Sequence, residues 1–340
     1  MTRSNDVLLR IRNLKVHFRQ ARRHPFATAS TVHAVDGVSL DVRRGSTFGL
    51  VGESGSGKTT TALATMRLAP ATSGTVELSG TNVLELRGES LRQMRRRMQI
   101  IFQDPYSSLN PRLRAGQIVR APLDQLQIGD SASREARVAE LFRYVGLRPE
   151  QQALFPHQFS GGQRQRVGVA RALATQPELI VCDEPVSALD VAIQAQILNL
   201  LRSLQKEFGL TYLFISHDLG VVQHMCDEIA VMYLGQIVEQ ADRLSLFRRP
   251  RHPYTWALLS AVPSADPALR ERANRIRLTG DPPSPIDLPS GCRFASRCPF
   301  AEQRCRDTPP PLRPIQDGHL AGCHLIDENG NAPHEQTALD

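Results

Sequence analysis

The stretch of sequence that most constrains the fold is "GESGSGKT", which occupies residues 52–59. It follows a short apolar run, Thr47 to Val51, and it opens a helical pattern. Because glycine has no Cβ, successive backbone N–H groups of such a loop can approach phosphate oxygens closely. The helix that begins near Lys58 adds the positive end of its dipole. A strand, a glycine-rich turn and a helix in this order predict a phosphate-binding loop in an α/β fold.

The polar residues of this loop have separate expected roles. Lys58 should reach the β- and γ-phosphates as a compact charge, and the Thr59 hydroxyl should bind Mg²⁺. The lysine is unlikely to be incidental to the pattern, since the chain has only three lysines, Lys15, Lys58 and Lys206. The residues expected to contact the nucleotide here are Gly52, Glu53, Ser54, Gly55, Ser56, Gly57, Lys58, Thr59 and Thr60.

Polar residues follow three further apolar runs. In "PELIVCDEP" the run from Leu179 to Cys182 is continuous, as in a parallel strand buried on both faces, and Asp183 and Glu184 come at its end. Asp183 is expected to hold the Mg²⁺, and Glu184 can accept a proton from an attacking water. "MQIIFQ" ends at Gln103 and "LTYLFISH" at His217. The carboxyl ends of parallel strands meet at one ligand crevice, so both side chains are predicted near the γ-phosphate.

Four more motifs make the interpretation specific: "FSGGQ" at residues 159–163, "CDEP" at 182–185, "SALD" at 187–190 and "SHD" at 216–218. Together with the phosphate-binding loop, their order and spacing resemble the ATP-binding-cassette (ABC) ATPases over residues 7–240. Phe159 stands where that family usually has leucine. The resemblance implies a P-loop NTPase core of the RecA-like type with an antiparallel β portion, an inserted α-helical subdomain, and ATP with Mg²⁺ as cofactors.

The same resemblance implies a role for each matching residue. The signature loop would bind the γ-phosphate held by a second cassette, because two subunits stack head to tail around two ATP molecules. Glu184 would be the general base, His217 the sensor of the γ-phosphate, and Asp190 would line the dimer seam. Phe18 is the best candidate for stacking on adenine, with His17 or a residue of the following insertion as alternatives. The remaining assignments are Ser160, Gly161, Gly162 and Gln163 on the partner's nucleotide, and Gln103 and Asp183 on Mg²⁺, with Gln103 also facing the transport partner.

The chain is expected to divide at about residue 250. Residues 1–250 form the ATPase domain, with an antiparallel edge portion at Val7–Phe18 and Val32–Val42 and a helical subdomain at about 104–176, where strand patterns vanish. "HPYTWALLSAVP" and "GDPPSP…PSGCRF…RCP" resemble the C-terminal extension of the oligopeptide/dipeptide importer ATPases. We therefore expect a Pro/Arg-rich linker at 251–290, a cysteine-rich segment at 291–325 and a disordered tail at 326–340.

The resulting functional hypothesis is the ATP-hydrolysing subunit of a bacterial peptide importer. Its partners would be a second cassette (a copy or a related chain), two membrane permease subunits and, indirectly, an extracytoplasmic solute-binding protein. No apolar run is long enough to cross a bilayer, so the chain is expected on the cytoplasmic face of the inner membrane. Alternatives are a soluble cassette protein of translation or DNA repair, or an importer of nickel or another small solute. The net charge of +7 comes from dispersed arginines, so no nucleic-acid partner is expected.

Four of the six cysteines fall in the last fifty residues: Cys292, Cys298, Cys305 and Cys323. Cytosolic disulfides are rare, so four thiolates there suit a Cys₄ zinc site or a [4Fe–4S] cluster. Structural zinc sites usually pair cysteines two to four residues apart, and no such pair exists here. The importer resemblance implies the iron–sulfur cluster, with zinc as the alternative. No sequence feature places these cysteines beside the ATP site, so a structural or regulatory role is expected.

Overall fold

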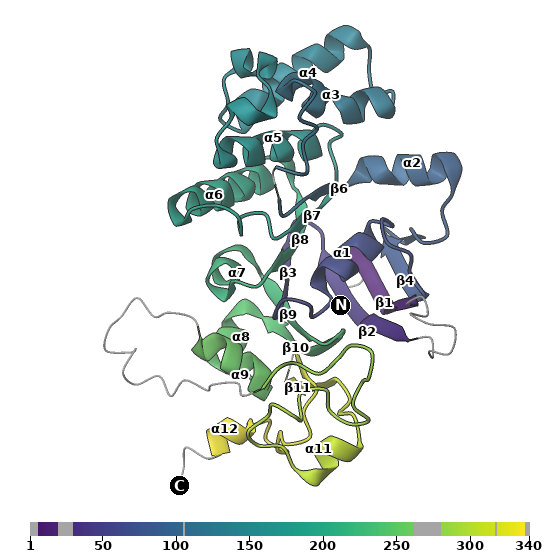
Figure 1. The fold of residues 1–340 in the computed structure, drawn as a ribbon, viewed down its shortest axis with the longest axis vertical. Helices are drawn as coiled ribbons and strands as arrows, with labels where there is room; N and C mark the ends of the chain where they lie inside the picture. Colours follow the sequence, from purple (N-terminus) through teal and green to yellow (C-terminus); the bar gives the residue numbers. More distant parts are fainter. Residues whose placement is uncertain (1–5, 20–29, 105, 262–279, 317, 337–340) are drawn as a thin grey trace.

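The computed structural model describes residues 6–19, 30–104, 106–261, 280–316 and 318–336. Figure 1 shows three regions along the long axis of the molecule. A group of helices lies at the top, two sheets with their flanking helices form the middle, and the C-terminal segments lie at the bottom. The helical region and the cysteine-rich region are therefore at opposite ends of the chain's long axis.

The smaller sheet is antiparallel and has the strand order β2–β1–β4–β5. Its strands are β1 (Val7–Arg19), β2 (Thr31–Arg43), β4 (Ser73–Leu78) and β5 (Thr81–Asn82). The long β1 and β2 pair from Val7 opposite Arg43 to Arg19 opposite Thr31. This confirms the predicted antiparallel portion near the start of the chain.

The larger sheet has the order β11–β12–β10–β9–β3–β8–β7–β6. Its parallel strands are β6 (Met98–Ile101), β7 (Leu179–Asp183), β8 (Thr211–Ser216), β3 (Thr47–Val51) and β9 (Glu228–Tyr233). Every residue of β3, β7 and β8 is buried, as their continuous apolar runs predicted. Three antiparallel strands extend the sheet beyond β9: β10 (Gln236–Asp242), β12 (His319–Ala321) and β11 (Arg313–Gln316).

Helices cover both faces of the larger sheet. One core cluster lies between the two sheets, where α1 (Lys58–Thr65) packs against β1 and β8. The second core cluster lies on the opposite face and continues into the helical region. The other helices flanking the sheets are α2 (Gly88–Arg97), α6 (Val191–Phe208), α7 (Leu219–Met225), α8 (Arg243–Arg248) and α9 (Pro253–Ser260).

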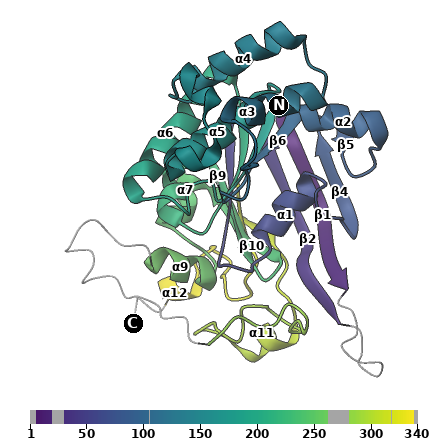
Figure 2. The same ribbon diagram turned by 45° about the horizontal axis from the view of Figure 1, so that its top comes forward.

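The helical region contains α3 (Ala115–Gln125), α4 (Ser131–Tyr144), the 3₁₀ turns Pro149–Ala153 and Pro156–Gln158, and α5 (Gly161–Leu173). Figure 2 shows these helices at one end of the molecule, away from α11 and α12. Local sequence signals explain where two of them begin. The Asp130 side chain accepts a hydrogen bond from Ser133 N, and Ser160 caps α5 in the same way through Gln163 N. No strand interrupts the described residues between β6 and β7, as predicted.

The region after residue 250 differs from the expected linker. Arg251, His252 and Tyr254 are almost completely buried, and the backbone N–H groups of Arg251 and His252 donate to the carboxylate of Glu239. That carboxylate also contacts His319 Nε2 at 2.7 Å, so β10 holds both parts of the C-terminal region. The first residues after position 250 therefore pack against the ATPase domain and do not form a linker.

The expected disordered tail is also wrong for residues 326–336. Ile326 and Ala332 are buried, and the short helix α12 (Pro333–Gln336) ends the described chain. Glu335 accepts hydrogen bonds from Arg249 at 3.1 Å and from the buried Arg251 at 2.7 Å. A buried guanidinium needs a charged partner, and this requirement holds the segment against the core. Another short helix, α11 (Gln303–Asp307), lies within the cysteine-rich segment.

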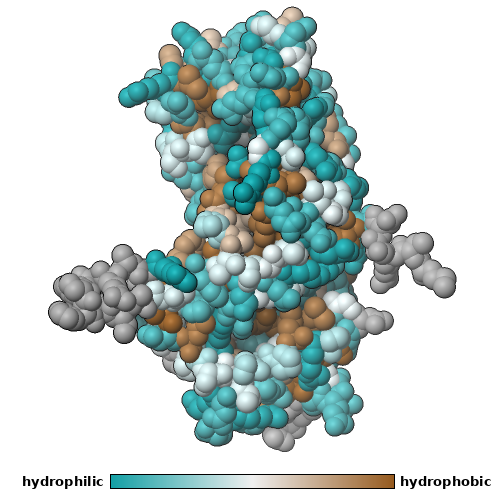
Figure 3. All heavy atoms as spheres, turned by 90° about the vertical axis from the view of Figure 1, so that its right-hand side faces the viewer, coloured by the Kyte–Doolittle hydropathy of each residue, from teal (hydrophilic) through white to brown (hydrophobic). Residues whose placement is uncertain are grey.

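None of the described helices is long and apolar enough to cross a membrane. On the face drawn in Figure 3, hydrophobic residues form small patches separated by hydrophilic ones.

Candidate active site

The phosphate-binding loop connects β3 to α1, as its sequence predicted. Two of its glycines are required by close approaches of other backbone. A Cβ at Gly52 would lie 2.1 Å from Met232 O, and one at Gly57 would lie 2.1 Å from Ala34 O. Both residues also have positive φ, 153° and 104°. The loop is therefore fitted between the two sheets and cannot accept side chains at these positions.

Lys58 and Thr59 are the first two residues of α1, and their side chains bind different partners. Lys58 Nζ donates to the carbonyls of Gly52 and Glu53, both at 2.8 Å, and burial lowers the pKa of this amine. The Thr59 hydroxyl donates to Asp183 Oδ1 at 2.9 Å. Burial raises the pKa of Asp183, since a charged carboxylate is poorly solvated there. A hydroxyl and a carboxylate in contact form a pair of oxygen donors that suits Mg²⁺.

Glu184 holds together the three strand ends that the sequence singled out. Its carboxylate oxygen Oε2 accepts a hydrogen bond from Gln103 Nε2 and contacts His217 Nδ1, both at 3.0 Å. Its backbone has a positive φ of 47°, unusual for glutamate, so the chain turns directly after Asp183 and the two carboxylates face different directions. The predicted meeting of strands β6, β7 and β8 at one crevice is confirmed.

These groups surround one cavity of about 600 Å³. It is lined by the phosphate-binding loop and by Gln103, Glu184 and His217. Leu258 and Pro285 line it as well, and both belong to the C-terminal region. Sequence analysis missed them, because apolar residues far along the chain carry no local signal of a shared site. Asp183 and Ser56 are buried and do not line the cavity.

The signature residues lie elsewhere in the chain. Ser160 caps α5, and Gly161 and Gly162 form its first turn, but none of them lines the cavity. Asp190 occupies the N-cap position of α6, although its side chain makes no capping hydrogen bond. This helix lies close to the signature loop, since a Cβ on Gly162 would lie 2.5 Å from Ile193 of α6. The chain therefore does not bring its own signature loop to its own phosphate-binding loop.

Phe18 lies in β1 opposite Val32. Val32 lines the cavity, whereas Phe18 does not, and its side chain is 41% exposed. The alternative in the following insertion, residues 20–29, lies outside the described residues. The assignment of the adenine-stacking residue stays a prediction.

Comparison with known proteins gives consistent matches over nearly the whole length. A relative in Sinorhizobium fredii, "Probable peptide ABC transporter ATP-binding protein y4tS", is 50% identical over 94% of this chain and 90% of its own length. "Oligopeptide transport ATP-binding protein AppF" of Bacillus subtilis is 45% identical over 96% of this chain and 99% of its own length. The chain belongs to the ATP-binding subunits of ABC transporters.

Models of two families match this ABC ATPase: ABC transporter over residues 35–187, and oligopeptide/dipeptide transporter, C-terminal region, over residues 238–305. Among solved structures, the ATP-binding cassette MJ0796, in a dimeric post-hydrolysis state with ADP and phosphate, is 28% identical. It aligns with a TM-score of 0.62 and covers 69% of this chain and 99% of that one. The P-loop fold and the ATPase activity coupled to transport follow from these similarities.

The geometry explains how this ABC ATPase can hydrolyse ATP. Backbone N–H groups of the loop and Lys58 are placed to bind the phosphates, and Thr59 and Asp183 would supply oxygen donors for Mg²⁺, which would neutralise phosphate charge. Glu184 lines the cavity, and its carboxylate can accept a proton from water. Gln103 and His217 orient that carboxylate by bonding its oxygen Oε2. Most of the acceleration comes from this positioning of charge.

The four cysteines of the C-terminal region line a second, smaller pocket. Cys292, Cys298, Cys305 and Cys323 meet there with Phe294 and His252. All four are free thiols, and burial raises the pKa of Cys298 to about 11 and that of Cys323 to about 12. Cys182 and Cys226 are buried in the main core. The structure thus brings the four cysteines of the C-terminal region to one pocket, and their role as ligands stays a prediction.

The expectation that nothing places the cysteines beside the ATP site is wrong. Arg297, the residue before Cys298, forms two hydrogen bonds with the Glu53 carboxylate, at 2.7 and 3.1 Å. Glu53 is part of the phosphate-binding loop and lines its cavity. The two residues are 244 positions apart, so no local pattern could reveal the contact.

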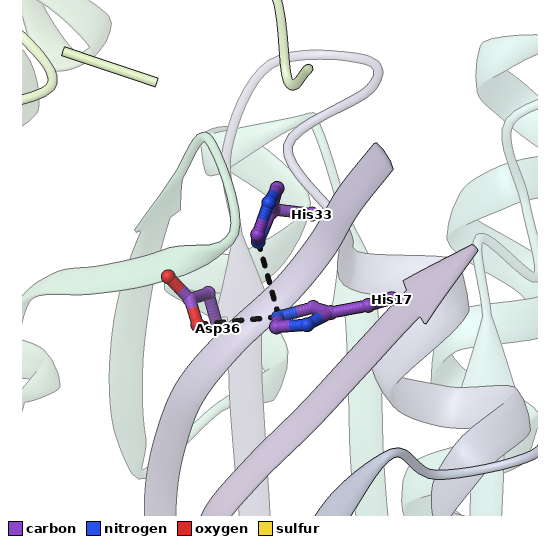
Figure 4. A group of neighbouring side chains, drawn as sticks. All are labelled: His17, His33 and Asp36. Atoms are coloured by element: carbon purple, nitrogen blue, oxygen red, sulfur yellow. Dashed lines mark hydrogen bonds and ion pairs between the residues drawn. The ribbon is translucent and has the colours of Figure 1, made fainter. Parts of the chain in front are cut away.

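A group of three side chains in β1 and β2 has the composition of a metal site. His17, His33 and Asp36 place their ligand atoms within 4.8 Å of one another (Figure 4). Asp36, however, already pairs with Arg293, and Lys15 Nζ lies 3.5 Å from the same carboxylate oxygen that faces His17. Burial opposes its ionisation, but these cations hold the pKa of Asp36 below its usual range. The group therefore anchors Arg293, the neighbour of Cys292, and is electrostatically unsuited to a metal ion.

Proposed function

We propose that this chain hydrolyses ATP to power the import of peptides through a bacterial ABC transporter. The complete set of Lys58, Asp183, Glu184 and His217 supports an active ATPase, not a cassette that only binds nucleotide. The C-terminal match to the oligopeptide/dipeptide family supports peptides as the solute. A soluble cassette of translation or DNA repair is disfavoured by this extension, and import of nickel or another small solute is the second candidate.

We also propose that the ATP sites are completed in a pair of cassettes. Ser160 and Gly162 do not line their own chain's cavity, and the MJ0796 cassette, an ABC relative, was solved as a dimer. In such a pair, Ser160, Gly161, Gly162 and Gln163 would bind the γ-phosphate held by the partner's loop. The adenine would stack on Phe18 or on a neighbouring residue.

Two membrane permease subunits are the proposed partners of the helical region, with the chain at the cytoplasmic face of the inner membrane. Asp104, Tyr106 and Ser107 support this, because they are exposed and closely follow Gln103, which contacts Glu184. We expect a photo-cross-linker at Ser107→Cys to label membrane subunits in cells. The same reagent at Gln303→Cys, exposed at the opposite end of the molecule, is the matched control. Labelling of ribosomal or DNA-repair proteins from Ser107 would support the alternative class instead.

The cysteine pocket is proposed to hold a [4Fe–4S] cluster. Four sulfur donors line one pocket, which fits either a cluster or zinc. The four cysteines are separated by five, six and seventeen residues, whereas structural zinc sites usually pair cysteines two to four residues apart. This spacing along the chain favours the cluster over zinc.

Protein purified without oxygen is expected to be brown, with broad absorption near the border of the visible and ultraviolet. Cys298→Ser should remove most of this absorption and the bound iron, while Cys182→Ser, in the main core, should not. Iron and zinc are measured by elemental analysis of the same samples. A colourless anaerobic preparation with one equivalent of zinc would decide for the alternative.

A further inference from the structure

The contact between Arg297 and Glu53 has the geometry of a strong ion pair. Both guanidinium donors face the carboxylate, at 2.7 and 3.1 Å, and the Arg297 side chain is only 7% exposed. Paired hydrogen bonds of this kind are stronger and more directional than single ones. An arginine side chain stays charged at every accessible pH, so the pair does not depend on protonation of Arg297.

The charge of Glu53 is a problem for a site that binds a triphosphate. Its carboxylate lies within the loop that cradles the phosphates, and Glu53 lines the cavity. An uncompensated negative charge at this position would repel the nucleotide, and partial burial makes that repulsion stronger than in water. Arg297 neutralises this carboxylate from the side of the cysteine-rich segment.

A second contact fixes the backbone of the same residue. Glu53 N donates to the Tyr254 hydroxyl at 2.8 Å. Tyr254 is fully buried and packs edge-on against Tyr233, with ring centres 4.6 Å apart. Its ring is tilted against that of Phe294, with ring centres 5.4 Å apart. Phe294 in turn lines the cysteine pocket. One loop residue is thus held at its side chain and at its backbone by the C-terminal region.

We infer that Arg297 and Tyr254 are positioning residues of the ATP site, which neutralise Glu53 and hold it so that the phosphate-binding loop accepts the triphosphate. The cysteine-rich segment then acts as a structural clamp on the nucleotide site. This inference concerns nucleotide affinity and stands whether or not the pocket holds a cluster.

The test is the dissociation constant of ATP in purified full-length protein, measured at low ionic strength. Arg297→Ala should raise it about tenfold, with a smaller increase for ADP, because ADP carries less negative charge. Glu53→Gln introduced into the Arg297→Ala protein should recover most of the lost affinity, since it removes the repelling charge. Tyr254→Phe deletes only the hydroxyl and changes no charge. It should therefore raise the dissociation constants of ATP and of ADP by the same factor.

Arg304→Ala is the matched control, because Arg304 forms an exposed ion pair with Glu302 in the same segment. It should leave the dissociation constant unchanged. If Arg297→Ala does not fold, Arg297→Lys keeps the charge but loses the paired geometry, and a milder loss is expected. ATP affinity equal to wild type in the folded Arg297 variant would overturn the inference, as would a loss that Glu53→Gln does not repair.

Discussion

Replacement of Glu184 by glutamine is expected to reduce ATP hydrolysis by a factor of about a hundred or more while preserving ATP binding. Glutamine cannot take the proton of the attacking water. It has nearly the same shape and can still accept the hydrogen bond that Gln103 Nε2 gives to Glu184. Lys58, Thr59 and Asp183, the residues proposed to bind phosphate and metal, are untouched by the change. Phosphate release in steady state measures the rate, and equilibrium binding measures the affinity.

Glu207→Gln provides the control for this variant. Glu207 is exposed on α6 and does not line the cavity, so hydrolysis should remain at the wild-type rate. The Glu184 variant should also accumulate as an ATP-bound pair, because the nucleotide that closes the pair is no longer consumed. Near wild-type hydrolysis by Glu184→Gln would show that another group accepts the proton.

The second large effect concerns how two chains share a site. Lys58→Ala removes the positive charge that is expected to bind the phosphates, and Ser160→Arg places a bulky side chain at the exposed start of α5. In preparations where this chain is the only cassette, each variant alone should be nearly inactive. When the two variants are mixed in equal amounts, half of the pairs contain one chain of each variant. Such a pair has one complete site, formed by the phosphate-binding loop of the Ser160→Arg chain and the signature loop of the Lys58→Ala chain. If the two sites work independently, about a quarter of wild-type activity should return.

The structure explains the choice of Ser160 over Gly162 for this experiment. Any side chain at Gly162 would collide with Ile193 of the same chain, so its loss of activity would have two causes. Ser160→Arg costs only the helix cap, about 1 kcal/mol of stability, which thermal unfolding can measure. A mixture no more active than its components, under conditions where the wild type is active, would contradict sites shared between chains.

The parts of the site predictable from sequence lie at the ends of strands. The runs before Gln103, Asp183 and His217 are apolar and short, which predicted buried parallel strands, and parallel strands place their carboxyl ends at one edge. The glycines of the phosphate-binding loop gave an equally local signal. In both cases the residue type, its position in a strand or turn and the function are tied to one another within a few residues.

The C-terminal region could not be predicted in this way. Its proline-rich composition indicated a linker, but Glu239 fixes its first residues through two backbone hydrogen bonds and His319. Its contacts with the ATP site join residues more than two hundred positions apart, such as Glu53 with Tyr254 and with Arg297. Such contacts depend on the three-dimensional path of the chain, and no periodicity of the sequence encodes them.

The central claim is that ATP hydrolysis by this chain drives the import of peptides. The most direct measurement is the uptake of radiolabelled peptides of two to five residues by cells whose only copy of this chain is wild type or Glu184→Gln. We predict ATP-dependent accumulation with the wild type and none with the variant, at equal amounts of both proteins in the membrane fraction. Equal peptide uptake in the two strains would contradict the account, and so would uptake of nickel in place of peptides.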